Sequence, residues 1–406
     1  MSGFSVGDQP WLTASATHAV MDALEVAGGP DCARFVGGSV RNAVLGQPVD
    51  DIDIATTLTP DAVVAALKAA GLRSVPTGID HGTVTAISDR RPYEITTLRR
   101  DVTTDGRNAT VAFTTDWAED AARRDFRLNA LYADRAGRII DPTGAGLDDA
   151  RAGRIVFVGE AETRIREDYL RILRFFRFYA WYGRGEPDAG AMAACAALKD
   201  GMGRLSAERV TKELLKLLAA PDPRSAVAAM ERAGVLERVL PGSQGHGRFE
   251  ALCGLSDDAL LRLSALSRPD ADSGLATARL RLSNAQRDRL IGALDTEASL
   301  DISDRQARAL IYRWGGGVVA DQVTLAWADA PERGEDATRL LDLAAQWSPP
   351  SMPVGGADVR ALGLAPGPLT GQALKAFEVG WIADDFPNEG HAERLAAILD
   401  ELRPQE

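Results

Sequence analysis

Residues 36–57, VGGSVRNAVLGQPVDDIDIATT, organise the rest of the chain. The apolar run before them ends in Gly37-Gly38, and paired glycines permit a tight turn and a close backbone approach. Residues 39–45 then have helical character, with Ser39 as the expected N-cap and Gly46 as the stop. A helix that starts directly after a turn presents free N–H groups, which suit a phosphate, and Arg41 adds a positive charge. The pattern predicts a strand–turn–helix unit that grips a triphosphate.

The alternating residues Asp51-Ile52-Asp53-Ile54 predict a strand. Side chains of a strand point alternately to its two faces, so Asp51 and Asp53 share one face while the isoleucines face the core. Two adjacent carboxylates repel each other unless a cation lies between them. Because a phosphate site is expected one short helix away, we predict that Asp51 and Asp53 are ligands of Mg²⁺.

Two further strands are expected beyond a helix at 61–70 that starts after Pro60 and stops at Gly71. They cover residues 83–87 and 93–98, with a polar turn at 88–92 between them. Glu94 lies on the second strand. Two interpretations of Glu94 stay open, a third catalytic carboxylate beside Asp51 and Asp53 or a charge at a sheet edge.

Residues 165–182, IREDYLRILRFFRFYAWY, predict one amphipathic helix, because apolar residues recur every three or four positions. Asp168, Arg171 and Arg174 step at three residues and so share a neighbouring face, which Arg177 extends. Such a stripe is either a solvated face paired with the preceding acidic residues or a binding surface.

In order and spacing, these motifs resemble the class II tRNA nucleotidyltransferase and bacterial poly(A) polymerase family. The matching residues are Gly37-Gly38-x-Val40-Arg41, Leu45-Gly46, Asp51-x-Asp53, Gly82-Thr83-Val84, Glu94-Ile95-Thr96-Thr97-Leu98-Arg99, Arg123-Arg124-Asp125-Phe126 with Asn129-Ala130, and Glu167-Asp168-x-x-Arg171-x-x-Arg174. Two positions depart from the pattern. Asn42 replaces the usual Asp, so it can accept a hydrogen bond from the arginine but supplies no charge, and Arg127 stands where Thr is usual. The resemblance covers about the first 240 residues.

The resemblance implies a catalytic role for Asp51 and Asp53, with Glu94 as the open third carboxylate. It implies a nucleotide site built from Gly37, Gly38, Arg41, Arg124, Asp168, Arg171, Arg174 and Arg177. Either Asp125 or Asn129 is expected to orient Arg124, and Arg174 and Arg177 are expected to contact the triphosphate.

Base choice can be argued from chemistry alone. A carboxylate accepts from an exocyclic amine, which cytosine and adenine carry on the Watson–Crick edge and which uracil and guanine replace with an oxygen. Asp168 would therefore favour C and A, while Arg171 reads the adjacent acceptor and helps to keep Asp168 ionised. The penalty for two facing acceptors is about 1–3 kcal/mol, roughly tenfold to hundredfold discrimination.

Residues 99–115 form a charged stretch with little hydrophobic period. Its Asp101, Asp105 and Arg107 resemble the flexible loop that, in CCA-adding members of the family, rearranges between addition of C and addition of A. Members that add only CC have a shortened loop. The full length here favours complete CCA addition.

Bulk properties narrow the class of protein. The three cysteines are far apart and fit no metal spacing, no apolar run reaches the length of a membrane span, and no secretory signal opens the chain, so we expect a cytoplasmic protein. The net charge of −12 argues against a general nucleic-acid binder, but positive residues gather in residues 164–184, and their distribution matters more than the sum.

The expected fold is α+β, a small mixed-sheet head of the polymerase-β-like nucleotidyltransferase type followed by an all-helical neck, body and tail. The expected parts are an N-terminal helix (1–28), the catalytic head (29–150), a neck that recognises the base (151–240), a helical body (241–346) and a tail that binds tRNA (347–406).

The expected function is template-independent addition of CCA to the 3′ end of tRNA from CTP and ATP. The expected mechanism is two-metal nucleotidyl transfer, in which Asp51 and Asp53 hold Mg²⁺ ions, one for the 3′-hydroxyl and one for the pyrophosphate that is released. No protein partner is inferred. A poly(A) polymerase is the main alternative, but such enzymes usually carry a basic segment where this chain has Gly78-Ile79-Asp80-His81-Gly82. A CC-adding enzyme and a catalytically inactive RNA-binding scaffold are two more candidate functions, and the retained Asp51 and Asp53 disfavour the scaffold.

Overall fold

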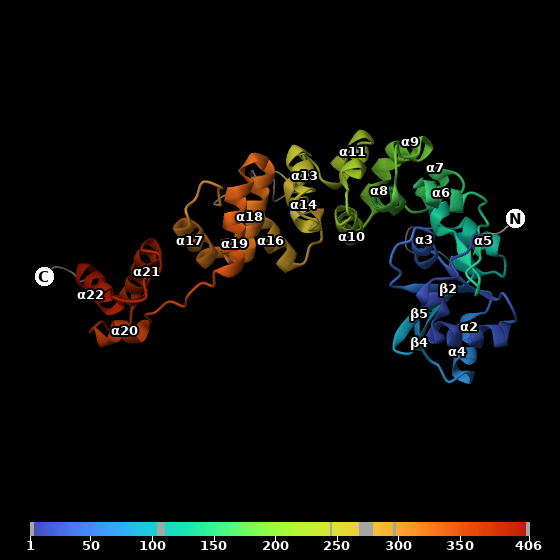
Figure 1. The fold of residues 1–406 in the computed structure, drawn as a ribbon, viewed down its shortest axis with the longest axis horizontal. Coiled ribbons are helices and arrows are strands. Elements are labelled where there is room, and N and C mark those ends of the chain that lie inside the picture. Colours follow the sequence, from blue (N-terminus) through green and yellow to red (C-terminus); the bar gives the residue numbers. More distant parts are fainter. Residues whose placement is uncertain (1–3, 104–109, 244–245, 268–278, 295–297, 403–406) are drawn as a thin grey trace. The chain divides into compact units, whose positions relative to one another are not determined.

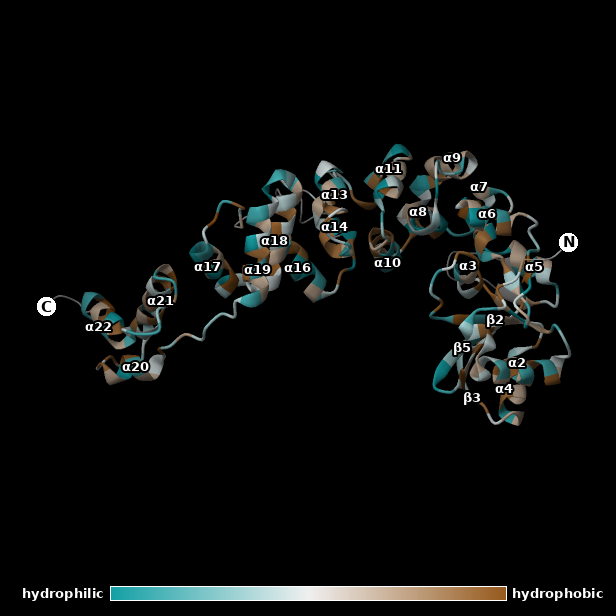
Figure 2. Ribbon diagram, viewed as in Figure 1, coloured by the Kyte–Doolittle hydropathy of each residue, from teal (hydrophilic) through white to brown (hydrophobic). Residues whose placement is uncertain are grey.

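The computed structural model describes residues 4–103, 110–243, 246–267, 279–294 and 298–402. Contacts divide the chain into two compact units, residues 1–242 and 243–406 (Figure 1). Helical ribbons in both units carry hydrophilic and hydrophobic residues on alternating sides (Figure 2), as expected for helices that bury one face.

The first unit begins with a mixed α/β head. Its elements are α1 (Pro10–Thr13), α2 (Ser15–Gly28), β1 (Ala33–Val36), α3 (Gly38–Val44), β2 (Ile52–Thr56), α4 (Pro60–Ala69), β3 (Arg73–Gly78), the 3₁₀ turn η1 (Ile79–His81), β4 (Thr83–Ser88), β5 (Arg91–Thr97), β6 (Arg99–Thr103), β7 (Thr110–Phe113), α5 (Trp117–Ala122), the 3₁₀ turn η2 (Arg127–Asn129), β8 (Tyr132–Ala133), β9 (Ile139–Ile140) and α6 (Gly146–Ala152). The predicted α+β class with a mixed-sheet head is confirmed.

Seven of the strands form one sheet in the order β3-β4-β5-β2-β1-β8-β9. Strands β2 and β5 pair in parallel, and the other neighbours pair antiparallel. One face is covered by the N-terminal helices, since the Tyr93 hydroxyl of β5 lies 3.0 Å from the Thr17 hydroxyl of α2 and Trp11 packs edge-on against Phe35. By strand alternation, Asp53 and Glu94 project from the opposite face.

The strand and helix predictions of the head need three corrections. The N-terminal helix is broken at Ala14, which has an extended backbone, and both of its parts pack on the head. Strand β3 was not expected, because its burial pattern is mostly exposed and gives no period-two signal. The stretch expected to be a loop contains a second, two-stranded sheet, β6–β7.

The rest of the first unit is helical. It contains α7 (Ala161–Glu167), α8 (Leu170–Tyr182), α9 (Ala189–Leu198), the 3₁₀ segment η3 (Lys199–Arg204), α10 (Ala207–Leu218), α11 (Arg224–Arg232) and α12 (Leu236–Val239). Phe126 of the head lies 4.8 Å from Phe157, 6.4 Å from Phe175 and 5.2 Å from Phe178 between ring centroids. These buried rings fix α8 against the head and so position the side chains that α8 carries.

The second unit is all helical in the part that the structure describes. Its elements are α13 (His246–Leu252), α14 (Ala259–Leu266), α16 (Asn284–Leu294), α17 (Asp304–Trp314), α18 (Gly316–Asp329), the 3₁₀ turn η4 (Pro331–Arg333), α19 (Gly334–Gln346), α20 (Gly356–Ala361), α21 (Pro368–Ala383) and α22 (His391–Leu402). Residues 298–340 and 354–399 contribute two separate hydrophobic clusters. Tyr312 of α17 packs against the second cluster and bonds to Glu378, which joins the two parts. The finer division into head, neck, body and tail stays a prediction.

Candidate functional site

Three carboxylates lie around the parallel pair β2–β5. Asp53 is half-buried on β2 and stands directly opposite Glu94 of β5 in the strand register. Asp51 precedes the first residue of β2 and is exposed, as is Glu94. Burial, the charge of Glu94 and that of Asp51 together raise the pKa of Asp53 to about 6, although Arg124 and Arg41 oppose the shift. The negative charges at this point of the sheet are therefore not balanced by the protein.

The donor set fits a hard cation. Among the described residues, no three His, Cys, Asp or Glu side chains gather closely enough to hold a metal ion on their own. Mg²⁺ is commonly bound by one or two carboxylates plus substrate phosphates, so a complete protein cage is not required. Asp51 and Asp53 suit that pattern. The part of Glu94 as a third carboxylate stays a prediction, supported by its position opposite Asp53.

The glycine turn brings the backbone against this acid pair. Gly37 has a φ of +70°, and a Cβ placed on it would lie 3.8 Å from Oδ2 of Asp53 and 3.7 Å from Nη1 of Arg124. Glycine is suited to the left-handed backbone here. The predicted N-cap was wrong, because helix α3 starts at Gly38 and Ser39 lies inside it, with its hydroxyl donating to the Val36 carbonyl at 3.1 Å.

Arg41 of α3 is held in place by neutral partners. Its guanidinium donates to Oδ1 of Asn42 at 3.1 and 2.9 Å, to Oδ1 of Asn129 at 2.7 Å and to the Tyr182 hydroxyl at 2.8 Å. It also lies over the rings of Phe178 and Tyr182. Burial lowers the pKa of Arg41, which is 8% exposed. Asn42 thus accepts the hydrogen bonds that were expected of it, and among the described residues no carboxylate bonds directly to Arg41.

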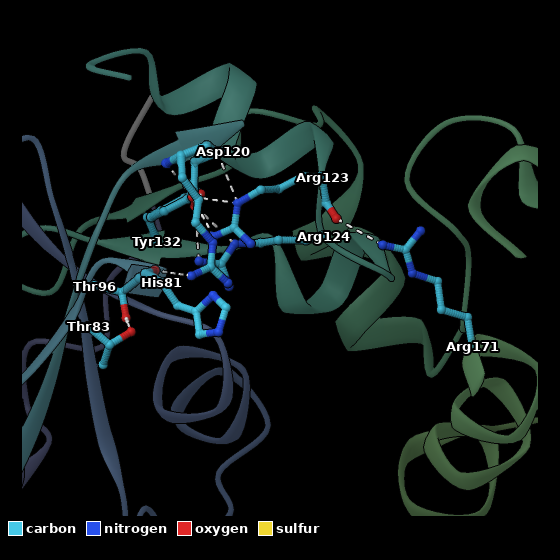
Figure 3. A network of polar contacts seen from close by, with 9 residues as sticks. His81, Thr83, Thr96, Asp120, Arg123, Arg124, Tyr132 and Arg171 are labelled. Atoms are coloured by element: carbon cyan, nitrogen blue, oxygen red, sulfur yellow. Dashed lines mark hydrogen bonds and ion pairs between the residues drawn. The ribbon is translucent and has the colours of Figure 1, made fainter. Parts of the chain in front are cut away.

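Arg124 is oriented by Asp120, a residue that the sequence reasoning missed (Figure 3). Asp120 on α5 is 1% exposed and accepts from Arg123 at 2.9 and 2.6 Å, from Arg124 at 3.3 and 3.0 Å and from the Tyr132 hydroxyl at 2.7 Å. Burial would raise the pKa of Asp120, but Arg124, Arg123 and Tyr132 lower it to about 2. The spacing of Asp120 three and four residues before the two arginines on a short helix was the available signal.

The two residues expected to orient Arg124 have other partners. Asp125 is bonded to Asn129 at 3.0 Å and to Arg174 of α8, whose Nε lies 2.8 Å from Oδ2. Arg174 lowers the pKa of Asp125 against the effect of burial. Asn129 in turn accepts from Arg41. Arg174 therefore joins α8 to the head. The guanidinium that was expected to contact the triphosphate is bonded to Asp125.

The helix predicted over residues 165–182 is two helices. Asp168 has an extended backbone between α7 and α8, and its side chain caps α8 by accepting from the Leu170 amide at 3.1 Å. The apolar residues Leu173 and Phe176, which follow the predicted spacing of three, are buried. A partner for Asp168 comes from Arg209 of α10, with Nη2 2.6 Å from Oδ2.

Arg171 does not contact Asp168 as expected. Its Nη1 bonds to Glu167 and to the Arg164 carbonyl, and its Nη2 donates to the Arg123 carbonyl at 3.3 Å (Figure 3). Arg209 was missed because it lies 41 residues from Asp168, so no local spacing connects them. Asp168 and Arg171, the two residues expected to read the base, are thus bonded to Arg209 and Glu167 and not to each other.

Arg177 lines a cavity of about 550 Å³ within the first unit. Its Nε lies 3.2 Å from Oε2 of Glu213, a buried residue of α10. The cavity is lined by Gly38, Arg41, Asp53, Arg177, Phe178, Trp181, Tyr182 and Lys216. It therefore extends from Asp53 to the C-terminal half of α8 and to α10.

Of the three residues that resemble the flexible loop, Asp101 lies within the described part of the chain. Asp101 is in strand β6, opposite Val111 in the register, while Asp105 and Arg107 lie outside the described residues. Asp120 also accepts from the amide of Arg99, the first residue of β6. The unusual Arg127 has Nη1 3.6 Å from Oδ2 of Asp149 on α6.

Two family models match the chain. The poly A polymerase head domain matches residues 33–156, and the probable RNA and SrmB-binding site of polymerase A matches residues 187–244. Together they cover strands β1 to β9 of the head and helices α9 to α12. No helix in the described part of the chain is both long and apolar enough to cross a membrane.

Curated relatives match over most of their length. The mitochondrial CCA tRNA nucleotidyltransferase 1 of Mus musculus is 33% identical over 86% of this chain and 82% of its own. The CCA-adding enzyme of Streptococcus gordonii is 34% identical over 91% of this chain and 94% of its own. The solved structure of the Bacillus stearothermophilus CCA-adding enzyme with CTP has a TM-score of 0.75 and 28% identity over 97% and 98% of the two chains. The chain therefore belongs to the family of CCA-adding tRNA nucleotidyltransferases.

Proposed function

We propose that this protein completes the 3′ end of tRNA by adding C, C and A from CTP and ATP without a nucleic-acid template. The observation that carries the proposal is the half-buried, charge-unbalanced Asp53, placed beside Glu94 and in contact distance of the glycine turn. A raised carboxyl pKa next to further acids is expected where a cation completes the site.

The family uses a divalent metal, and Mg²⁺ fits the oxygen donors of this site. We assign it to Asp51 and Asp53. When bound there, Mg²⁺ supplies a Lewis acid for the primer 3′-hydroxyl and charge neutralisation for the pyrophosphate that leaves. The protein itself contributes position and charge, because phosphoryl transfer leaves it little covalent chemistry.

Neighbouring groups of the protein hold each proposed nucleotide-binding residue in position. The backbone of Gly37 approaches Asp53, and that of Gly38 approaches the guanidinium of Arg41, so the phosphates can lie against the turn. Arg41, which donates to Asn129 and Tyr182, keeps its charge available for an anion, whereas Arg124 is aimed by Asp120. A fixed arginine loses less conformational entropy on binding than a free one.

Base choice is assigned to Asp168 and Arg171. Asp168 accepts from the exocyclic amine of C or A, and its ion-pair partner is Arg209 rather than Arg171. Arg171 is held by Glu167 and two backbone carbonyls, which fix its position for a base acceptor. Arg174 and Arg177 support the site through Asp125 and Glu213.

The test is to extend a tRNA transcript that lacks its last three nucleotides with CTP, ATP and Mg²⁺, and to sequence the product ends. Ends that stop at CCA support the proposal. A long A tract would identify a poly(A) polymerase, and ends that stop at CC would identify a CC-adding enzyme. Asp53→Asn serves as the inactive variant, and Asp61→Asn, an exposed aspartate in the first turn of α4, serves as the matched control.

The cytoplasmic location also stays part of the proposal. The mouse and human relatives are named as mitochondrial enzymes, so family membership does not fix the compartment.

A further inference from the structure

The cavity beside Asp53 has an aromatic and cationic wall to which the proposed reaction assigns no role. Its wall is formed by Phe178, Trp181 and Tyr182 from the C-terminal half of α8 and by Lys216 from α10. Ring centroids of Phe178 and Tyr182 lie 5.7 Å apart, and those of Trp181 and Tyr182 lie 6.5 Å apart. The rings thus follow one another along a single side of the cavity.

Trp181 is both exposed and fixed. It is 39% exposed, whereas Phe175, Phe176, Phe178 and Tyr179 of the same helix are buried. Its indole Nε1 donates to the Lys216 carbonyl at 2.7 Å, so the plane of the ring is set by α10. An exposed aromatic ring with a fixed orientation is suited to stacking, because little conformational entropy is lost when a flat partner binds.

Cations surround these rings. The guanidinium of Arg41 lies 4.3 Å from the Tyr182 centroid, and that of Arg177 lies 4.6 Å from the Phe178 centroid. Lys216 has no ion-pair partner among the described residues, and desolvation together with the nearby Arg177 lowers its pKa. Aromatic rings interleaved with positive charge are typical of surfaces that bind single-stranded nucleic acid.

The wall is too far from the base-reading residues to hold the incoming base. Asp168 and Arg171 are at the N-terminal end of α8 and do not line the cavity. Ten residues of helix separate Arg171 from Trp181, a rise of about 15 Å. Asp53, by contrast, lines the same cavity as Trp181. A strand whose end reaches Asp53 along this wall would not compete with the base held at Asp168.

We propose that Trp181 is a stacking platform for the unpaired 3′-terminal bases of the RNA primer, with Lys216 contacting the phosphate that follows. The inference rests on the proposed function and adds a positioning residue for the RNA rather than for the nucleotide. Stacking tolerates any terminal base. One platform can therefore serve a primer that ends in the base before the CCA sequence, in C or in CC.

Three variants separate the ring from its hydrogen bond. Trp181→Phe keeps a flat ring and removes the donor to the Lys216 carbonyl. Trp181→Gln removes the ring and keeps an N–H donor, and Trp181→Ala removes both. Each is assayed by steady-state kinetics with ATP and a tRNA transcript that ends in CC, and each melting temperature is compared with that of the wild type.

The platform predicts that Trp181→Gln and Trp181→Ala raise KM for the tRNA about tenfold, within the range for loss of one stacked base, and leave KM for ATP unchanged. Trp181→Phe stays within about threefold of the wild type. If Trp181→Gln keeps the wild-type KM for the tRNA and Trp181→Phe does not, Trp181 acts only through its hydrogen bond to the Lys216 carbonyl. That result would overturn the proposal. A rise in KM for ATP alone, or no change in any variant, would overturn it as well.

These outcomes are distinct from a failure of the proposed function. If the wild type adds no nucleotide to tRNA, the proposed reaction is wrong. If the wild type is active and the Gln and Phe variants are equal to it, only the platform is wrong. Trp181→Phe keeps only the flat ring, and Trp181→Gln keeps only the N–H donor. If one of these two variants fails to fold, the other still tests the platform.

Discussion

Asp53 and Asp120 both belong to the head, and burial shifts the pKa of both in the same direction. Their pKa values nevertheless move apart. Burial alone would raise both. Asp53 faces Glu94 and Asp51 and its pKa rises to about 6, whereas Asp120 is surrounded by Arg123, Arg124 and Tyr132 and its pKa falls to about 2. In the proposed site a cation from outside the protein would balance the charge of Asp53, whereas arginines of the protein itself balance the charge of Asp120.

The arginines divide in the same way. Arg174 is paired with Asp125, which raises its pKa against burial, while Arg41 has neutral partners and a lowered pKa. Arg174 thus holds α8 against the head, whereas Arg41 has no carboxylate bonded to it among the described residues. Charge balance alone does not separate positioning residues from binding residues, because Arg124, which we propose to bind the nucleotide, is itself paired with Asp120.

The largest expected effect is at Asp53. Replacing it by Ala or Asn should reduce nucleotide incorporation at least 1,000-fold, roughly the loss of one essential metal ligand. The measurement is single-turnover incorporation of [α-³²P]CTP into a tRNA transcript. Loss of less than tenfold, with Asp61→Asn as the unaffected control, would show that the unbalanced carboxylate is not the catalytic one.

The second effect is on base choice. Asp168→Ala should lower the preference for CTP and ATP over UTP and GTP about tenfold to hundredfold, because the acceptor for the exocyclic amine is lost. Arg209→Ala should lower it in the same direction and by less, since Asp168 stays in place but loses its ion-pair partner. Competition assays with all four nucleotides provide the measurement. Unchanged preference in Asp168→Ala would refute this account of selectivity.

The smallest of these effects concerns pH. Because Asp53 is ionised only above about pH 6, protons compete with Mg²⁺ below that value, and the affinity for Mg²⁺ should fall about tenfold per pH unit. Calorimetric titration of Mg²⁺ without nucleotide at pH 5, 6, 7 and 8 measures it. Asp53→Asn should lose the dependence. A constant affinity between pH 7 and pH 5 would place the metal elsewhere.

Much of this site could be predicted from the sequence, because its elements are local. The glycine turn, the Asp-x-Asp strand and the buried face of α8 each depend on residues a few positions apart, and their spacing reflects backbone geometry. Asp53 and Glu94 were correctly placed on strands for that reason, and the register brings them opposite each other. Asp51, also expected on the strand, lies one residue before β2.

The errors concern partners that are distant in sequence or breaks that a neighbouring element imposes. The pairing of Asp168 with Arg209 depends on how α10 packs, which no spacing reveals. The break before α8 was missed because the apolar period continues through it, while the side chain of Asp168 caps the new helix. Asp120 could have been found, since it lies one turn before two arginines.

The most direct test of the comparison is the change in unfolding free energy at pH 8 for Asp53→Asn and Asp120→Asn. The raised pKa of Asp53 makes its ionisation costly, so stability falls as pH rises through the window from about 4 to about 6, and Asp53→Asn should be more stable than the wild type by about 3 kcal/mol at pH 8 without metal. The lowered pKa of Asp120 contributes stability that is present above about pH 4 and lost towards pH 2, so Asp120→Asn should be less stable by about 2 kcal/mol at pH 8. Opposite signs are the predicted result, and changes of the same sign in both variants would contradict the account.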